Sequence, residues 1–137
     1  PNSDLVALVG SLLRMRGLPQ QLLLTSHGGM VTADFESVWT EAITQVLRRE
    51  ARLHLDLEAG RTREEIVAVG IFFANKERAP LPMRRFLYMW DQIMYDHHLR
   101  VLEQGGLATF FPEVGALAAA AHNEGLMAKQ RTHRRRA

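Results

Sequence analysis

The stretch TADFESVWTEAITQVLRREARLHLDLEAG, residues 32–60, decides the fold class. Its apolar side chains recur every three or four residues, the spacing of one face of an α-helix. They are Phe35, Val38, Trp39, Ala42, Val46, Leu53 and Leu57. Thr32 can cap the start and Gly60 can end the helix. The pattern therefore predicts one helix over residues 33–59, about 40 Å long at about 1.5 Å per residue, which would organise the domain.

Two shorter segments precede this helix. Residues 4–16 have apolar positions at helical spacing behind a possible N-cap at Ser3 or Asp4, so they predict a helix. Pro19 then stands at a possible first helical position, ahead of the pair Gly28 and Gly29. The interpretation there is a short helix followed by a loop.

The residues after Gly60 begin with the pattern of a capping box, formed by Thr62 and Glu65. The apolar run at residues 66–74 fits a buried helix or a buried strand, and the capping box favours the helix. Pro80 and Pro82 then break the chain.

Two further helices are predicted in the last third of the chain. Residues 83–104 carry one apolar stripe, formed by Phe86, Trp90, Ile93, His97 and Val101. Pro112 can start another helix, whose small residues 116–121 would allow close packing against a neighbour. The sequence thus predicts an all-α, compact, bundle-like domain of five or six helices. We expect both tryptophans, Trp39 and Trp90, to be largely buried in it.

Composition narrows the class of protein. With 137 residues, 47% hydrophobic and 23% charged, the chain has the size and composition of one soluble globular domain. The absence of cysteine excludes disulfides, thiolate zinc sites and a cysteine nucleophile. This fits an intracellular protein or one inside a virion, rather than secretion through disulfide-dependent folding. The longest apolar runs, such as residues 67–74, are too short to span a bilayer, so no membrane association is expected.

The net charge of +2 hides an uneven distribution of charge. The C-terminal residues 129–137 contain five cations and no acid, namely Lys129, Arg131, Arg134, Arg135 and Arg136. Residues 1–128 keep 12 of the 17 lysines and arginines against all 15 acids, a net charge of −3. We therefore divide the chain into a helical domain, residues 1–128, and a basic tail, residues 129–137.

The basic tail is the main candidate for function. Clustered cations bind a polyanion by releasing its condensed counterions, and they need no defined fold to do so. We expect the five cations of the tail to bind nucleic acid or another polyanion. A nuclear-localisation signal or an inert end are the alternatives.

Other residues are secondary candidates. Two groups of arginines could contact phosphate or pair with nearby acids: Arg48, Arg49 and Arg52, and Arg84 and Arg85. Phe110 and Phe111 lie between Gly106 and Pro112, so they would anchor a partner protein if they were exposed.

The histidines are the weakest candidates. His97 lies on the apolar stripe and is expected to be buried, whereas His98 is expected at the surface, on the side of Asp91. Glu50, His54 and Glu58 are four residues apart and predict a charged, solvated helical face. Arg49 and His54 also resemble the Arg-x4-His pair of helical HEPN-type ribonucleases. No metal site, cofactor or catalytic residue is assigned.

These observations lead to one hypothesis and two alternatives. The hypothesis is a non-enzymatic helical protein that assembles through its body and holds nucleic acid or another polyanion with its tail. A viral or phage structural protein, or a chromosome-associated factor, has this plan. Self-association or a protein partner is expected with it. The first alternative is a helical adaptor or regulator with an incidental tail. The second is a small helical enzyme that uses His54 or His97.

Overall fold

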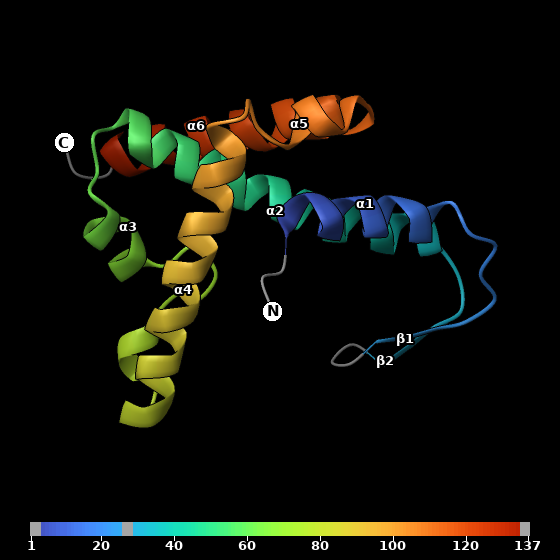
Figure 1. Ribbon diagram of the computed structural model, residues 1–137, viewed down its shortest axis with the longest axis horizontal. Helices are drawn as coiled ribbons and strands as arrows, with labels where there is room; N and C mark the ends of the chain where they lie inside the picture. The colour runs from blue at the N-terminus through green and yellow to red at the C-terminus, as the bar shows by residue number, and fades with distance from the viewer. Residues whose placement is uncertain (1–3, 26–28, 135–137) are drawn as a thin grey trace.

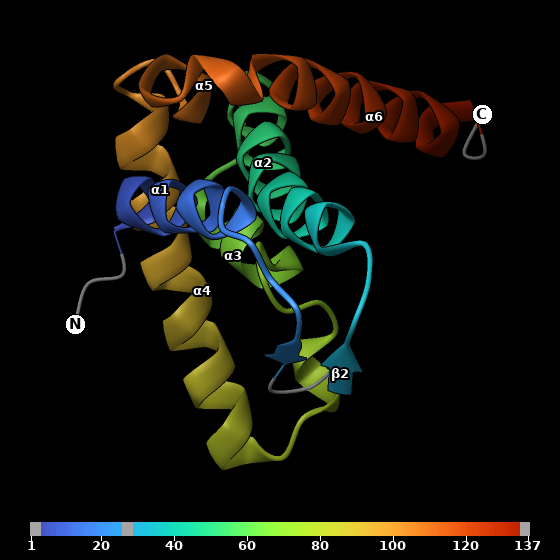
Figure 2. The same ribbon diagram turned by 90° about the vertical axis from the view of Figure 1, so that its right-hand side faces the viewer.

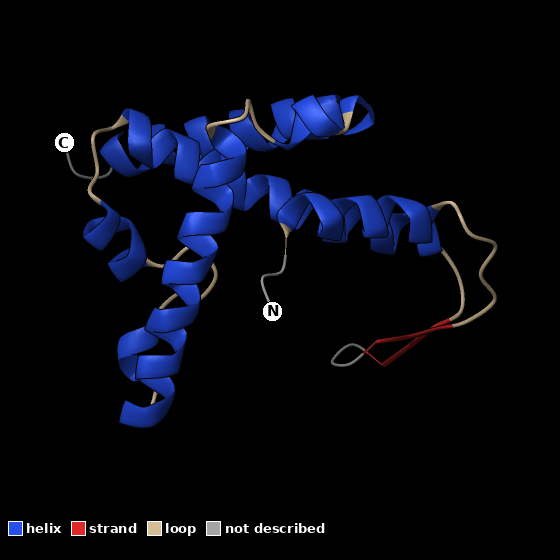
Figure 3. Ribbon diagram, viewed as in Figure 1, coloured by secondary structure: helices blue, strands red, loops and turns tan. Residues whose placement is uncertain are grey.

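The computed structural model describes residues 4–25 and 29–134 and shows an all-α domain, with a single small hairpin as its only strands in this part of the chain (Figure 3). The elements in chain order are α1 (Leu5–Arg16), β1 (Leu23–Thr25), β2 (Gly29–Val31), α2 (Phe35–Glu58), α3 (Arg63–Val69), α4 (Leu81–Leu102), α5 (Leu107–Phe110) and α6 (Gly115–Arg134). Short 3-10 turns, Lys76–Arg78 and Pro112–Val114, precede α4 and α6. Among the described residues, none of these helices is both long and apolar enough to cross a membrane.

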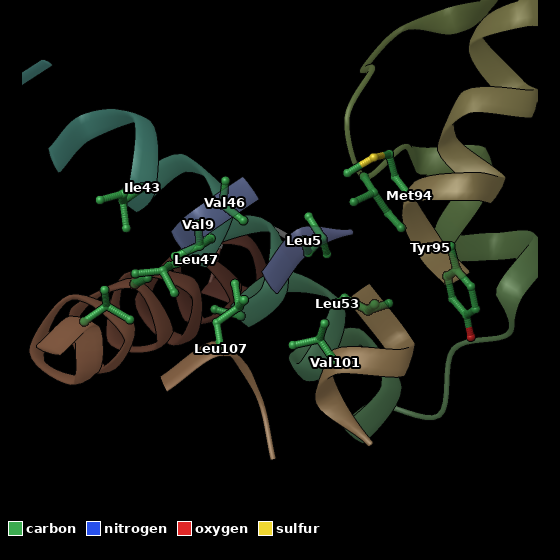
Figure 4. Packing of buried hydrophobic residues seen from close by; sticks show 14 of the residues in the cluster. Leu5, Val9, Ile43, Val46, Leu47, Leu53, Met94, Tyr95, Val101 and Leu107 are labelled. Atoms are coloured by element: carbon green, nitrogen blue, oxygen red, sulfur yellow. The ribbon is translucent and has the colours of Figure 1, made fainter. Parts of the chain in front are cut away.

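The predicted long helix is α2, and it is the centre of the domain. It packs against α6 most extensively, then α1 and α4, and α6 and α4 extend in different directions from it (Figure 1). Leu5 and Val9 of α1 face Val46 and Leu47 of α2 across the core (Figure 4). Val9, Leu47 and Leu107 are almost fully buried, so three separate helices meet on this core.

Most helix ends agree with the sequence. Asp4 caps α1 by accepting hydrogen bonds from the backbone N–H groups of Val6 and Ala7, and the capping box of Thr62 and Glu65 is formed at the start of α3. The expected cap of α2 is wrong. The helix begins at Phe35 behind Asp34, whose φ of 55° is left-handed, and Thr32 lies outside it.

The expected short helix after Pro19 is wrong. The chain instead forms the antiparallel hairpin of β1 and β2, in which Leu23 pairs with Val31 and Leu24 with Met30. Periodicity cannot separate helix from strand in an apolar run as short as residues 22–24. The hairpin projects from the helical body, and Leu24 and Met30 are exposed (Figure 1).

The apolar run at residues 66–74 is neither one helix nor one strand. α3 ends at Val69, because Gly70 adopts a φ of 97° and the chain turns there. The N–H groups of Phe72 and Phe73 then donate to the carboxylate of Asp91 on α4, at 2.8 and 3.3 Å. This side chain satisfies backbone groups that a helix would have satisfied internally.

The stripe of α4 is buried over only part of its length. His97 and Val101 are buried beside α1 and α2, whereas Phe86 and Ile93 remain exposed. Trp39 and Trp90 are both mostly buried, as expected, although neither is completely enclosed. Trp39 uses its indole N–H to donate to Gln20, at 3.0 Å.

Candidate functional site

A buried carboxylate gathers three cations where α2 ends beside α6. Asp56 has a side chain only 6% exposed, and its oxygens lie 3.4 Å from Lys129 Nζ, 3.5 Å from Arg61 Nη1 and 4.0 Å from Arg52 Nε. We call these four residues the Asp56 cluster. One negative charge faces three positive charges, so the cluster has a net charge of +2.

Local structure explains how the cluster forms. Arg52 and Asp56 are four residues apart on α2 and therefore share a helical face. Gly60, with a φ of 71°, turns the chain back, and the N–H of Arg61 donates to the carbonyl of Asp56 at 3.1 Å. Lys129 reaches over from α6 and also donates to the carbonyl of Leu55.

A groove of about 540 Å³ separates α2 from the C-terminal half of α6 and contains the Asp56 cluster. We call it the α2–α6 groove. The groove is open because small residues line it, including Ala59, Ala121 and Ala128. Gly125 allows α6 to pack closely on α2, because a Cβ atom there would lie 2.7 Å from Leu55 Cδ1.

Arg48 lies at the other end of the α2–α6 groove and is already paired. Its Nε donates to Glu124 of α6 and its Nη1 to Glu41, both at 2.9 Å. The hydrogen bond to Glu124 is the largest cause that raises the pKa of Arg48. Arg48 therefore joins the two helices, and the surplus positive charge of the groove belongs to the Asp56 cluster.

The predicted basic tail begins inside a helix. α6 continues to Arg134, so Lys129 and Arg131 are helical, and Lys129 contacts the body through the Asp56 cluster. Arg131 is exposed, and the backbone of Arg134 lies in the last turn of α6. Arg135 and Arg136 lie outside the described residues. The division of the chain at residue 128 and the role of the tail stay predictions.

The secondary arginines lie in three separate places. Arg48 and Arg52 line the α2–α6 groove with Lys129. Arg49 points elsewhere, with its guanidinium 4.1 Å from the centre of the Phe72 ring, and burial lowers its pKa. Arg84 pairs with Glu77 at 3.1 Å near the start of α4, where Arg85 is exposed. Figure 2 shows that end of α4 far from α6.

Phe110 and Phe111 have different surroundings. Phe110 is 36% exposed, whereas Phe111 is half-buried and packs against the core. The ring of Phe111 lies so close to α1 that a Cβ atom on Gly10 would be 3.3 Å from it. A partner contact at this place stays a prediction, and Phe110 is the residue available for it.

Glu50 and His54 of α2 lie on the opposite side of the α2–α6 contact, together with His122 of α6. Glu50 is buried and accepts the backbone N–H of Leu107 at 3.1 Å, so the predicted solvated face is wrong for this residue. Burial is the main cause that raises the pKa of Glu50, and the Leu107 bond opposes it. His54 is half exposed, lies 3.7 Å from Glu58, and has its ring centre 5.7 Å from that of His122.

The two adjacent histidines of α4 are both buried. His97 is buried as predicted, but His98 is completely buried, so its expected surface position is wrong. Within the described ranges, no group of three or more histidines and acids is placed to hold a metal ion. The resemblance to an Arg-x4-His pair has no counterpart in space, since Arg49 stacks on Phe72 and His54 faces His122.

No protein family, curated protein sequence or solved structure matches the chain. Its function must therefore be argued from its own residues. The Asp56 cluster was missed in the sequence because Arg61 returns to α2 only through the turn at Gly60, and Lys129 reaches Asp56 only by a tertiary contact from α6. The spacing of Arg48, Arg52 and Asp56 on one helical face was the available signal.

Proposed function

We propose that this chain is a non-enzymatic assembly protein that binds nucleic acid, or another polyanion, through the α2–α6 groove and the basic tail together. The observation that carries the proposal is the Asp56 cluster. Three cations from the end of α2, the turn after it and α6 converge on a single buried carboxylate. That cluster lies at the point where α6 leads into the basic tail.

The cations of the cluster remain available to a ligand. The side chains of Arg52 and Arg61 are 47% and 45% exposed, while Asp56 is buried beneath them. Ion pairs of half-exposed side chains contribute little free energy, so a phosphate can share or replace them. Guanidinium groups bind phosphate oxygens through two parallel hydrogen bonds, which makes Arg52 and Arg61 suitable contacts for a phosphate backbone.

The α6 helix connects the groove to the tail. Lys129 is fixed by its bonds to Asp56 and Leu55, and Arg131 follows it by half a turn on the exposed side. A phosphate chain in the groove would thus continue along α6 toward its end at Arg134. Phosphate contacts position a nucleic acid without reading its bases, so we expect little sequence preference.

The first test removes two cations of the groove. In Arg52→Gln/Arg61→Gln, two charge-assisted hydrogen bonds are lost, and binding of labelled single-stranded or duplex nucleic acid should weaken by about tenfold or more at low salt. Fluorescence anisotropy measures this. Arg100→Gln is the matched control, because Arg100 is an exposed cation of α4 outside the groove, and it should leave the affinity unchanged.

Two further variants separate the groove from the tail. Deletion of residues 131–137 keeps Lys129 and its contacts, and should weaken binding while α6 stays folded. Asp56→Asn removes the buried negative charge and should tighten binding. If the double arginine variant and the deletion both bind as tightly as the intact chain, the proposal is wrong.

A further inference from the structure

The N-terminal half of α4 exposes a continuous apolar stripe. Its members, which fall within one helical face, are Met83, Phe86, Met89, Trp90 and Ile93. Met83, Phe86 and Met89 are each about half exposed, and the rings of Phe86 and Trp90 pack together with centres 5.9 Å apart. We call this set the α4 stripe.

The body covers the same face of the helix only further along. His97 and Val101 continue the line of the α4 stripe and are buried where α1 and α2 pack against α4. The half of α4 that carries the stripe extends beyond α1 (Figure 2). The apolar face therefore runs along most of α4, but within the described chain the rest of the fold covers this face only at the C-terminal half of the helix.

The exposed surface area of the molecule leaves room for an interface of standard size. The chain exposes 9234 Å², whereas a folded monomer of 15.5 kDa exposes about 7,200 Å² by the usual scaling of area with mass. The excess is about 2,000 Å², and a standard stable interface removes about 800 Å² from each partner. The hairpin also projects and adds exposed area. The α4 stripe is the better candidate for an interface, because it presents aromatic side chains on a rigid helix.

We propose that two copies of this chain associate in solution through the α4 stripe, with their α4 helices antiparallel. An antiparallel pair centred near Tyr88 places Met83 opposite Ile93 of the second copy and Phe86 opposite its Trp90. Such an interface uses the same patch on both copies and closes on itself. It also sets the two helix dipoles in opposite directions.

The charges beside the α4 stripe fit this orientation. Arg85 and Asp96 lie along the same edge of the stripe, one toward each end, with the exposed Gln92 between them. An antiparallel pair brings Arg85 of each copy toward Gln92 and Asp96 of the other. A parallel pair would place the two copies of Arg85 on opposite sides of the seam, each away from Asp96 of the other copy. Asp96 is half exposed and pairs with Arg63 at 2.8 Å, so it can accept a second cation.

Sedimentation velocity of the full chain across low to high micromolar concentrations tests the association. We expect a reversible dimer for the unchanged chain and a monomer for Phe86→Glu/Ile93→Glu, with the helical circular dichroism retained because both side chains are exposed. Met127→Glu is the control, since Met127 is equally exposed on α6, and it should remain dimeric. A monomeric unchanged chain, or a dimer that survives the double substitution, overturns the proposal.

Disulfide trapping tests the orientation, because the chain contains no cysteine of its own. Met89→Cys lies near the proposed centre and should form a covalent dimer on mild oxidation. Leu81→Cys lies at the end of α4 and should not, since an antiparallel pair separates the two copies of this position. Rapid trapping through Leu81→Cys, with little through Met89→Cys, would contradict the antiparallel pair.

Discussion

His98 is a fully buried imidazole whose two ring nitrogens have no hydrogen-bond partner within the described part of the chain. Burial is the main cause that lowers its pKa to about 4, and the positive charge of Arg49 and the neighbouring His97 act in the same direction. The neutral form is therefore the one that the fold accepts. A protonated His98 would be an uncompensated charge beside a guanidinium.

This burial predicts that stability falls in mild acid. In the unfolded chain the imidazole has its ordinary pKa of 6.5, so below that pH the unfolded state binds a proton that the folded state rejects. The free energy of unfolding should be unaffected above pH 7 and should drop by about 2 kcal/mol by pH 5. Urea unfolding at pH 7 and pH 5 measures the drop.

His98→Leu is the comparison for that experiment. It removes the titrating group and should make the loss of stability between pH 7 and pH 5 much smaller. Burial also raises the pKa of Glu50. Its effect on stability is the same in both proteins and cancels when their losses between pH 7 and pH 5 are compared. An equally steep loss in the variant would show that other groups cause the acid sensitivity.

The two histidines also show how far single residues could be predicted. His97 was placed correctly because it belongs to the apolar stripe. His98 was placed at the surface because Asp91 lies on its side of the helix, and an aspartate usually indicates solvent. The structure buries Asp91 completely by pairing it with Lys76, 2.5 Å away, and no local pattern in the sequence shows this pair.

At the scale of elements, the Lys76–Asp91 pair fixes the irregular segment between α3 and α4. Asp91 accepts hydrogen bonds from the N–H groups of Phe72 and Phe73 and from Lys76 Nζ, and Lys76 also donates to the carbonyl of Phe73 at 3.1 Å. Both side chains are almost fully buried. The pair replaces the hydrogen bonds that α3 would have made had it continued past Val69.

This arrangement predicts that removing either partner strongly lowers the free energy of unfolding, and that the loss differs between the two partners. Lys76→Met leaves a buried carboxylate that still has two N–H donors, and it should destabilise the fold by about 3–5 kcal/mol. Asp91→Leu leaves a buried ammonium and two unpaired N–H groups, so it should cost more. Chemical denaturation of both variants measures the order, and equal or negligible losses would contradict this account of the segment.

The elements that sequence patterns predicted best are those with long periodic runs. α1, α2 and α4 were expected from apolar spacing and helix-end signals, α6 was expected from Pro112 and the small residues after it, and α2 was expected to organise the domain. The hairpin and the end of α3 were missed for one reason. In apolar runs this short, the choice between helix, strand and turn is made by tertiary contacts such as Asp91 to Phe72, not by local periodicity.

At the scale of the whole molecule, the Asp56 cluster and the α4 stripe lie on different elements. The cluster lies where α2 meets α6, whereas the α4 stripe lies on the half of α4 that extends away from α6 (Figure 2). The uneven charge was visible in the sequence, since the last nine residues hold five cations. The groove was not, because it needs Arg61 and Lys129 to meet at Asp56. A protein that binds a polyanion with one surface and itself with another would use this arrangement for assembly.

The salt dependence of nucleic-acid binding tests the central claim most directly. The groove and the tail offer seven cations: Arg52, Arg61, Lys129, Arg131, Arg134, Arg135 and Arg136. The slope of log affinity against log salt should therefore reach about −5 to −6 for the intact chain. Arg52→Gln/Arg61→Gln should make the slope shallower by about 1.5, and deletion of residues 131–137 by about 3. Slopes that stay the same in both variants would show that the phosphate contacts lie elsewhere, and a slope near zero for the intact chain would show that it makes none.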